Sequence, residues 1–197
     1  MAMENIKSGK LLYHLTKLSN LDSILENGLA PRKLIIEEDV KFADVADPDI
    51  ISKRNKLELD NYTPFHFHPY SAFDVAVKNK YNDEEFFYIC ITRKLARENE
   101  FKILCKHPLT IDECNLMDYD VGFENIDWDT MHTRGTVDDY SKHVKMAECL
   151  TNFIIPVDCF HSIAVRNIKI KSFIEQRLIE LDIMTPPPYI NVMPWFD

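Results

Sequence analysis

The sequence predicts an α+β fold, and two observations indicate this class: short β-rich runs outnumber helical ones, and the two kinds do not alternate regularly. A third observation argues against a membrane protein, because no apolar run approaches the roughly 20 residues that cross a bilayer. With 46% hydrophobic residues among 197, the chain can bury a core, and its four glycines leave no room for a glycine-rich repeat or linker. We expect one domain spanning residues 1–197, not a doubly wound parallel sheet.

The first third of the chain predicts a strand, a short helix and a long loop. Residues 10–16 are rich in β-forming side chains, so they predict a strand. Ser19 and Asn20 then supply helix-capping side chains before apolar residues at helical spacing, and Gly28 marks the helix end. Residues 36–61 are polar and acidic with little periodicity, which predicts a loop with one helical turn at most.

The rest of the chain predicts more strands than helices. β-Rich or alternating runs predict strands, and apolar residues at helical spacing predict helices. The expected strands are 62–69, 86–92, 145–155 and 163–165, and the expected helices are 71–79 and 172–181. Residues 107–140 are acidic and weakly patterned, so we expect a functional or mobile loop there.

Charge and cysteine content restrict the classes of function. The net charge of -9 argues against a broadly basic nucleic-acid binder, so such a role needs a local basic groove. The five cysteines are odd in number and form no CxxC pair, which predicts reduced thiols, no disulfide framework and no structural zinc site. The first residues lack the apolar core of a signal peptide, so we expect a soluble, cytoplasmic protein.

Three polar side chains stand out within the predicted strands. If residues 145–155 form a strand, Glu148 shares a face with Met146 and Leu150, where a carboxylate is costly unless it has a partner or a function. The alternative is an edge-strand glutamate that reaches solvent. His14 and Thr16 share one face of the first strand and form either a functional polar pair or a satisfied core pair.

Two further candidates come from the region after the first helix. Arg54 lies in a basic island within an acidic segment, where a guanidinium either clamps a diphosphate or is simply solvated. His66 and His68 share a strand face, but no third ligand follows at a metal-like spacing, so we expect no metal.

Taken in order, several segments resemble the DarT-type ADP-ribosyltransferase toxin family. The opening strand with His14-Leu-Thr16 and the helix after Asn20, ending in Gly28-Leu29, resemble the start of that family. The matching segments further on are Tyr62-Thr-Pro-Phe-His-Phe-His-Pro69-Tyr-Ser71, Ile126-Asp-Trp128, Met146-Ala-Glu148-Cys-Leu150 and Pro194-Trp-Phe196. The match is collinear over nearly the whole chain.

The resemblance implies a split mixed β-sheet of the ADP-ribosyltransferase type with flanking helices and NAD in its cleft. It implies transfer of ADP-ribose to a base, usually thymine, in single-stranded DNA, and neutralisation by a macrodomain antitoxin, DarG. By position, Glu148 is the catalytic glutamate and Arg54 lies near the phosphates of NAD. His14, Thr16 and Asn20 contact NAD, and Ser71 falls within the pocket-lining segment.

These residue types suit the chemistry of that reaction. Cleaving the bond between nicotinamide and ribose builds oxocarbenium character, which a nearby carboxylate stabilises best in a dry site. Glu148 or Arg54 is then placed to help deprotonate the attacking base. Two alternatives stay open: an RNA, protein or small-molecule acceptor, with Met146 and Tyr70 as discriminating residues, or a non-catalytic module that binds NAD or nucleic acid.

Overall fold

The computed structural model describes residues 6–45, 48–69, 71–81, 83–108, 115–133, 135, 138–183 and 187–193. Its strands are β1 (Leu11–Lys17), β2 (Thr63–His66), β3 (Phe86–Thr92), β4 (Lys102–Leu104), β5 (Met117–Asp118), β6 (Glu148–Thr151), β7 (Ser162–Val165) and β8 (Tyr189–Val192). They form an eight-stranded sheet in the order β5-β4-β6-β2-β1-β3-β7-β8. Neighbours are antiparallel except for β7 and β8, which are parallel, so the sheet is mixed, as predicted.

The sheet is divided into two blocks between β1 and β2. β1 pairs with β3 along its whole length, from Leu11↔Thr92 to Lys17↔Phe86, whereas it pairs with β2 at the single position Tyr13↔His66. Because backbone pairing holds strands side by side, a single pair lets β1 and β2 diverge. The split sheet implied by the family resemblance is therefore present.

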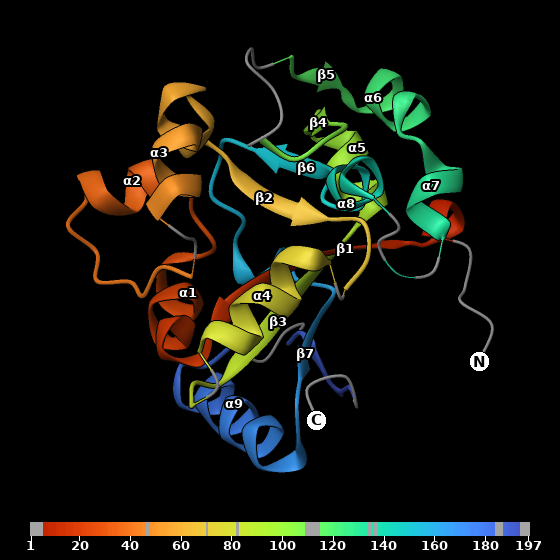
Figure 1. The fold of residues 1–197 in the computed structure, drawn as a ribbon. Coiled ribbons are helices and arrows are strands. Elements are labelled where there is room, and N and C mark those ends of the chain that lie inside the picture. The colour runs from red at the N-terminus through yellow and green to blue at the C-terminus, as the bar shows by residue number, and fades with distance from the viewer. Residues whose placement is uncertain are drawn as a thin grey trace.

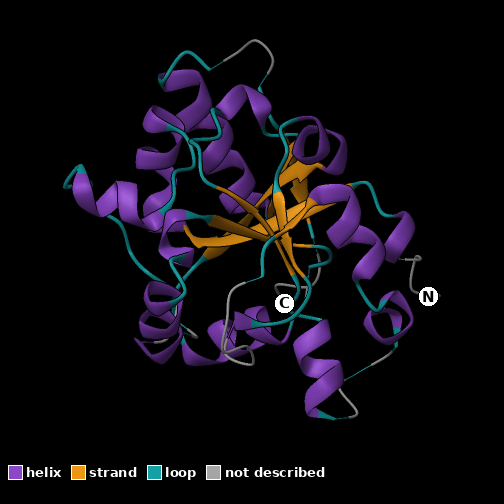
Figure 2. Ribbon diagram, turned by 90° about the horizontal axis from the view of Figure 1, so that it is seen from above, coloured by secondary structure: helices purple, strands orange, loops and turns teal. Residues whose placement is uncertain are grey.

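Helices surround the sheet, which occupies the centre in the view from above (Figure 2). Beside the split, at the left of Figure 1, stand α1 (Leu21–Asn27), α2 (Arg32–Glu37) and α3 (Pro48–Lys56). The α4 helix (Ala72–Lys80) lies across β1 and β3, and α9 (Ile168–Glu180) lies at the lower end of the molecule in Figure 1. The opposite side carries α5 (Arg93–Glu98), α6 (Tyr119–Asn125), α7 (Trp128–His132) and α8 (Asp139–Val144).

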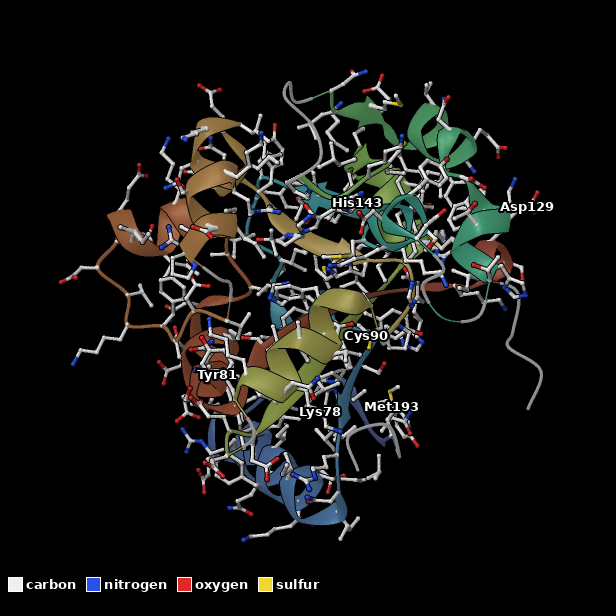
Figure 3. The ribbon with its side chains drawn as sticks, in the orientation of Figure 1. Lys78, Tyr81, Cys90, Asp129, His143 and Met193 are labelled. Atoms are coloured by element: carbon white, nitrogen blue, oxygen red, sulfur yellow. The ribbon has the colours of Figure 1, made fainter. Side chains whose placement is uncertain are left out.

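Four 3-10 turns complete the described elements: η1 (Ile6–Ser8), η2 (Leu18–Asn20), η3 (Leu59–Asn61) and η5 (Val157–Cys159). Alternate side chains of the strands enter two apolar clusters. Leu12, Ile89 and Cys149 belong to the larger one, and Leu15 and Cys90 belong to a smaller one with Val77 of α4. Figure 3 labels Cys90 at this second cluster. The period-two pattern thus buries both faces of the central strands.

Several predicted elements are confirmed. The strand expected at 86–92 is β3. Those expected at 10–16 and 163–165 overlap β1 and β7 with one-residue shifts at their ends, and the one expected at 62–69 contains the shorter β2. The first helix ends where Gly28 adopts a φ of 81°, a left-handed conformation that glycine accepts at little cost. The helix expected at 71–79 is α4, and the one expected at 172–181 is α9, which begins earlier, after Asn167 caps its first turn.

Three expectations were wrong. The region 36–61 is not mainly a loop, because it contains the end of α2, then α3 and η3. No residue of α3 is fully buried, so this helix leaves no clear apolar stripe in the sequence. The region 107–140 contains α6, α7 and the start of α8, each too short to show periodicity. The strand expected at 145–155 shrinks to β6, because α8 ends at Val144 and a turn occupies the residues before Glu148.

Two whole-chain expectations bear on function. Cys90, Cys105, Cys149 and Cys159 are free thiols, and Cys114 lies outside the described residues. Burial raises the pKa of Cys90 to about 12, so this thiol is protonated near neutral pH and unreactive. Within the described ranges, none of the helices has the length and apolar character needed to cross a membrane.

Candidate active site

A cavity of about 300 Å³ lies where β1 and β2 diverge. Its walls come from β1, β2, β6, α1 to α3 and the segment that follows α2. Strand alternation places His14 on the face of Leu12, whereas Glu148 pairs with His66 and therefore shares the face of Tyr13. Both side chains nevertheless line the same cavity, because the split opens the sheet between them.

Glu148 is the first residue of β6, and only 4% of its surface is exposed. The β6 strand is paired on both sides, with His66 of β2 and Leu104 of β4 opposite Glu148. This double pairing fixes the backbone that carries the carboxylate. The alternative of an edge-strand glutamate that reaches solvent is therefore wrong.

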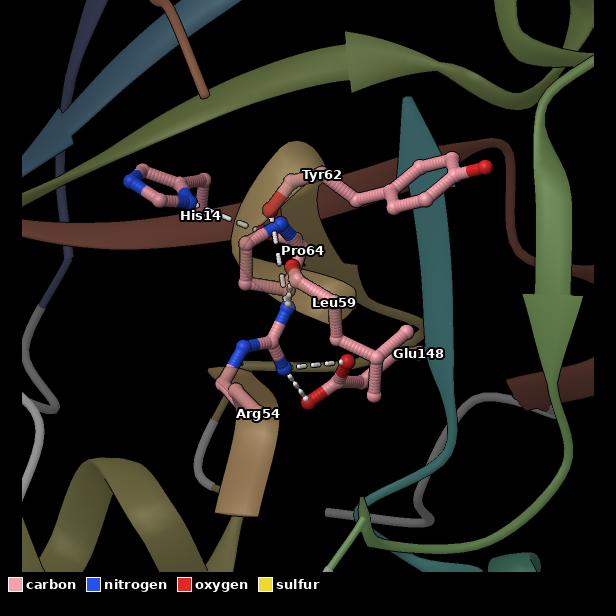
Figure 4. Close-up of polar contacts among 6 residues, drawn as sticks. All are labelled: His14, Arg54, Leu59, Tyr62, Pro64 and Glu148. Carbon is pink, nitrogen blue, oxygen red and sulfur yellow. Dashed lines mark hydrogen bonds and ion pairs between the residues drawn. The ribbon is translucent and has the colours of Figure 1, made fainter. Parts of the chain in front are cut away.

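Arg54 of α3 meets Glu148 in the cavity (Figure 4). Its Nη1 donates to both carboxylate oxygens, at 2.9 and 2.7 Å, and its Nη2 donates to the Leu59 carbonyl at 3.2 Å and, more weakly, to the Tyr62 carbonyl at 3.5 Å. With 12% of its side chain exposed, Arg54 is therefore a largely buried partner of the glutamate and not a solvated loop residue.

The pairing explains how a carboxylate can be buried here. An isolated buried charge costs several kcal/mol, and an opposite charge with good hydrogen-bond geometry offsets much of that cost. One guanidinium nitrogen bonds both oxygens, which leaves further lone pairs of the carboxylate free to accept hydrogen bonds. The carboxylate of Glu148 is thus held in one orientation and can still receive a hydroxyl group.

His14 is fixed in a single tautomer by the strand next to it. Its Nδ1 lies 2.8 Å from the Pro64 carbonyl oxygen, and because a carbonyl only accepts, Nδ1 carries the proton. Burial lowers the pKa of His14 from 6.5 to about 4. The ring is therefore neutral near pH 7, and its Nε2 is a hydrogen-bond acceptor.

Thr16 and Asn20 form a second fixed group on the same side of the cavity. Asn20 Nδ2 donates to Thr16 Oγ1 and to the Ala43 carbonyl, both at 3.0 Å, while its Oδ1 accepts from the Ala43 backbone N at 2.7 Å. Asn20 precedes α1 as its N-cap, but its side chain makes no capping hydrogen bond. The carboxamide instead ties the cavity segment around Ala43 to β1.

Ser71 is placed differently from the other predicted residues. It does not line the cavity but caps α4, where its Oγ accepts from the Asp74 backbone N at 3.2 Å. Its own backbone N donates to Asp74 Oδ2 at 2.8 Å, which completes a capping box. Ser71 is fully buried, so the structure assigns it a helix-capping position, and Tyr70 lies outside the described residues.

Two histidines reach the cavity that we did not predict as functional residues. His66 lies beside Glu148 on the neighbouring strand, and the period-two pattern of 62–69 was the signal for it. His107 follows β4, and burial lowers its pKa to about 4. Its backbone N donates to the carbonyl of His143, a residue of α8 that Figure 3 labels. Within the described ranges, no cluster of three or more His, Cys, Asp or Glu residues is arranged to hold a metal.

Comparison with known proteins shows the family of this chain. The family model described as "ssDNA thymidine ADP-ribosyltransferase, DarT" matches residues 13–196. The chain belongs to the DarT family. It is therefore an NAD-dependent ADP-ribosyltransferase by family, as the sequence motifs predicted. No curated protein matches the chain.

Solved structures of DarT proteins share the fold at low sequence identity. Thermus sp. 2.9 DarT in complex with ADP-ribosylated ssDNA matches with a TM-score of 0.81 and 17% identity, over 95% of each chain. The same protein in complex with NAD+ matches with a TM-score of 0.74 and 15% identity, over 96% of this chain and 98% of that one. Thermosipho africanus DarTG in complex with ADP-ribose matches with a TM-score of 0.75 and 19% identity, over 95% of this chain but 51% of that one.

Proposed function

We propose that this chain transfers ADP-ribose from NAD to a thymine base in single-stranded DNA, with Glu148 at the reacting ribose. The observation that carries the proposal is the buried Glu148–Arg54 pair in a cavity that neutral His14 also lines. Family membership supports the donor and the acceptor class, and both are named in the complexes of Thermus DarT.

Glu148 would act on the ribose that loses nicotinamide. As the C1′–N bond breaks, positive charge develops at C1′, and a carboxylate in a dry site stabilises that charge strongly. The lone pairs that Arg54 leaves free can accept a hydrogen bond from a ribose hydroxyl. Because Glu148 is 4% exposed, little water screens this interaction.

His14 would orient the same ribose from the other side of the cavity. Its Nε2 can accept a hydrogen bond because Nδ1 is occupied by Pro64. Thr16 and Asn20, bonded to each other, would hold the wall behind the ribose. In this arrangement NAD is held by groups that are already in place before it binds.

Arg54 would first of all hold Glu148 in its reactive orientation. Both Nη atoms are already hydrogen-bonded, to Glu148 and to backbone carbonyls. A contact with a phosphate of NAD, which we predicted from the family resemblance, would have to share these nitrogens or use Nε. That second role stays a prediction.

We also infer the setting in which the enzyme works. The Thermosipho africanus relative is described as DarTG, which favours a DarG-type macrodomain antitoxin as the partner of this chain. Free thiols and an NAD-consuming reaction favour the cytoplasm. The net charge of -9 favours contact with few phosphates, and therefore an acceptor read mainly through its bases.

Mass spectrometry of short oligonucleotides incubated with NAD tests the proposal. We expect thymine-containing single strands to gain the mass of one ADP-ribose, with release of nicotinamide, and Glu148→Gln to abolish the gain. Matched RNA strands and proteins serve as competing acceptors. If only RNA or only protein is modified, the acceptor is not DNA. If no acceptor leads to nicotinamide release, the chain is a non-catalytic module.

A further inference from the structure

The proposed reaction needs a group that accepts a proton. The sequence led us to expect Glu148 or Arg54 in this role, but the contacts of both residues in the cavity leave it open. Thymine in DNA carries its one ring N–H at N3, because N1 is bonded to the sugar. When N3 bonds to C1′ of the ribose and nicotinamide leaves, that proton must pass to a base. This inference therefore rests on the proposed function and asks which side chain accepts the proton.

Four charged or titratable side chains around the carboxylate are poor candidates. A guanidinium does not lose its proton in proteins, which excludes Arg54. Both Glu148 oxygens accept from Arg54, and the remaining lone pairs face the ribose in the proposed reaction. His14 and His107 have pKa values lowered to about 4 by burial, and so weak a base takes a proton inefficiently near neutral pH.

His66 is placed next to the reacting centre by the sheet itself. It is the direct register partner of Glu148 across β2 and β6. Directly opposite residues in an antiparallel pair share a face, with Cβ atoms about 5 Å apart. His66 also lines the cavity, and so both side chains can reach the same substrate atoms.

The imidazole of His66 has no hydrogen bond to any described residue. Its Nδ1 is buried without a partner, and the residue is 7% exposed. The two neighbouring histidines each have Nδ1 engaged: that of His14 lies 2.8 Å from the Pro64 carbonyl oxygen, and that of His68 lies 2.9 Å from the Pro69 carbonyl oxygen. Nε2 of His68 is also buried without a partner, but His68 does not line the cavity. A buried polar ring that lacks a partner is costly, and a substrate group in the cavity would remove that cost.

Phe73 places an aromatic surface beside this ring. The ring centroids of His66 and Phe73 are 6.0 Å apart at an interplanar angle of 32°, and both side chains line the cavity. Unpaired bases stack on such rings in proteins that bind single strands. A base stacked there would bring its ring nitrogen toward His66.

We propose that His66 is the catalytic base that takes the N3 proton of the acceptor thymine. The N3–C1′ bond forms, the C1′–N bond to nicotinamide breaks, and the N3 proton moves to the imidazole, so that atoms and charge balance. The imidazolium that results lies across from the Glu148 carboxylate, which stabilises it until the proton is released to water. In this proposal Glu148 stabilises the charge that develops on the ribose, and His66 deprotonates the acceptor.

The test compares two acceptors that differ in acidity. One oligonucleotide carries thymidine and the other carries 5-chloro-2′-deoxyuridine, in which chlorine replaces the methyl group at similar size and makes N3–H more acidic. For His66→Gln we expect the rate of transfer to thymidine to fall by on the order of 10²–10⁴-fold, which is the usual contribution of a general base to the rate. On the more acidic acceptor the deficit should shrink by at least about tenfold, because an acidic proton needs less help to leave.

His68→Gln is the matched control, because His68 also has a buried ring nitrogen without a partner, Nε2, but does not line the cavity. It should keep transfer within a few-fold of wild type on both acceptors, and NAD affinity of His66→Gln should match wild type. An equal deficit on both acceptors, or no deficit, would overturn the role of His66. Absence of transfer and of nicotinamide release by the wild-type protein would instead refute the proposed function itself.

Discussion

The two walls of the cavity differ in how their polar groups are held. His14, Thr16 and Asn20, here called the NAD wall, are all hydrogen-bonded within the protein. His66, Phe73 and Met146, here called the acceptor wall, offer an imidazole with a buried unpartnered Nδ1 and two apolar side chains. In the proposed function, the first wall is preorganised for NAD, while the second is completed by the acceptor.

The split in the sheet produces this difference. β1 is paired along its whole length with β3, so the NAD wall stands on a rigid strand. The acceptor wall begins at the last residue of β2, where pairing with β1 is limited to Tyr13↔His66. Glu148 lies between the two walls and is held by Arg54 from α3.

Loss of Arg54 should have the largest effect on stability. Arg54→Met leaves the Glu148 carboxylate buried without its partner, and breaking a buried pair in this way typically costs about 3–5 kcal/mol. Urea unfolding measures the change. The double variant Arg54→Met/Glu148→Leu should be more stable than Arg54→Met alone. If its loss of unfolding free energy equals the sum of the losses in the two single variants, the two side chains are not coupled.

Asn20→Ala should have the next largest effect, because one side chain makes three hydrogen bonds that tie Thr16 and Ala43 together. We expect a loss of about 2–4 kcal/mol in unfolding free energy, since the buried partners lose their bonds. The matched control is Asn99→Ala, whose exposed carboxamide bonds only the Leu95 carbonyl among described groups. Equal losses in the two variants would contradict a rigid NAD wall.

Acid should destabilise the protein through His14 and His107. The pKa of each lies near 4 in the folded state and near 6.5 in the unfolded state, so the unfolded chain binds more protons between these values. Their contribution is complete above pH 6.5 and is lost as the pH falls toward 4, by on the order of 1–3 kcal/mol for each residue. Denaturant midpoints are measured from pH 7 to 4. The midpoint should depend less on pH in the variant His14→Gln/His107→Gln than in wild type, and an equal dependence on pH would contradict the burial of these two histidines.

The smallest effect we expect is that of salt on DNA binding. With a net charge of -9, the protein can neutralise few phosphates. The slope of log affinity against log salt should be shallower than about -2, which corresponds to about three phosphates on a single strand. Fluorescence anisotropy with a labelled oligonucleotide measures it, and a steep slope would reveal a basic surface near the acceptor wall.

The sequence predicted the parts of the fold that have strong local patterns. β1, β3 and α1 have β-rich runs, helical spacing or a glycine stop, and each was found near its expected place. The α3 helix was missed because none of its residues is fully buried, and α6 and α7 were missed because each spans two turns or fewer. Such elements are held by contacts with distant residues, which no local pattern records.

The sequence predicted the site residues that lie in recognisable motifs, but not those that reach the cavity through strand pairing or packing. Motifs singled out Glu148, Arg54 and His14, and the structure brings all three to one cavity. No local pattern, however, joins Arg54 to a carboxylate 94 positions later. His66 emerged as a neighbour of Glu148 only through the register of β2 and β6. His107 was hidden in a segment that looked like a loop, because its burial depends on packing between β4 and α8.

The most direct test of the two-wall account is the dissociation constant of NAD, measured by calorimetry for His14→Phe and His66→Phe. The same substitution removes an imidazole from each wall. His14→Phe should weaken NAD binding by about tenfold or more, the equivalent of roughly one lost hydrogen bond, and His66→Phe should stay within about twofold of wild type. The opposite pattern, or equal weakening in both, would contradict the assignment of NAD to the wall built on β1.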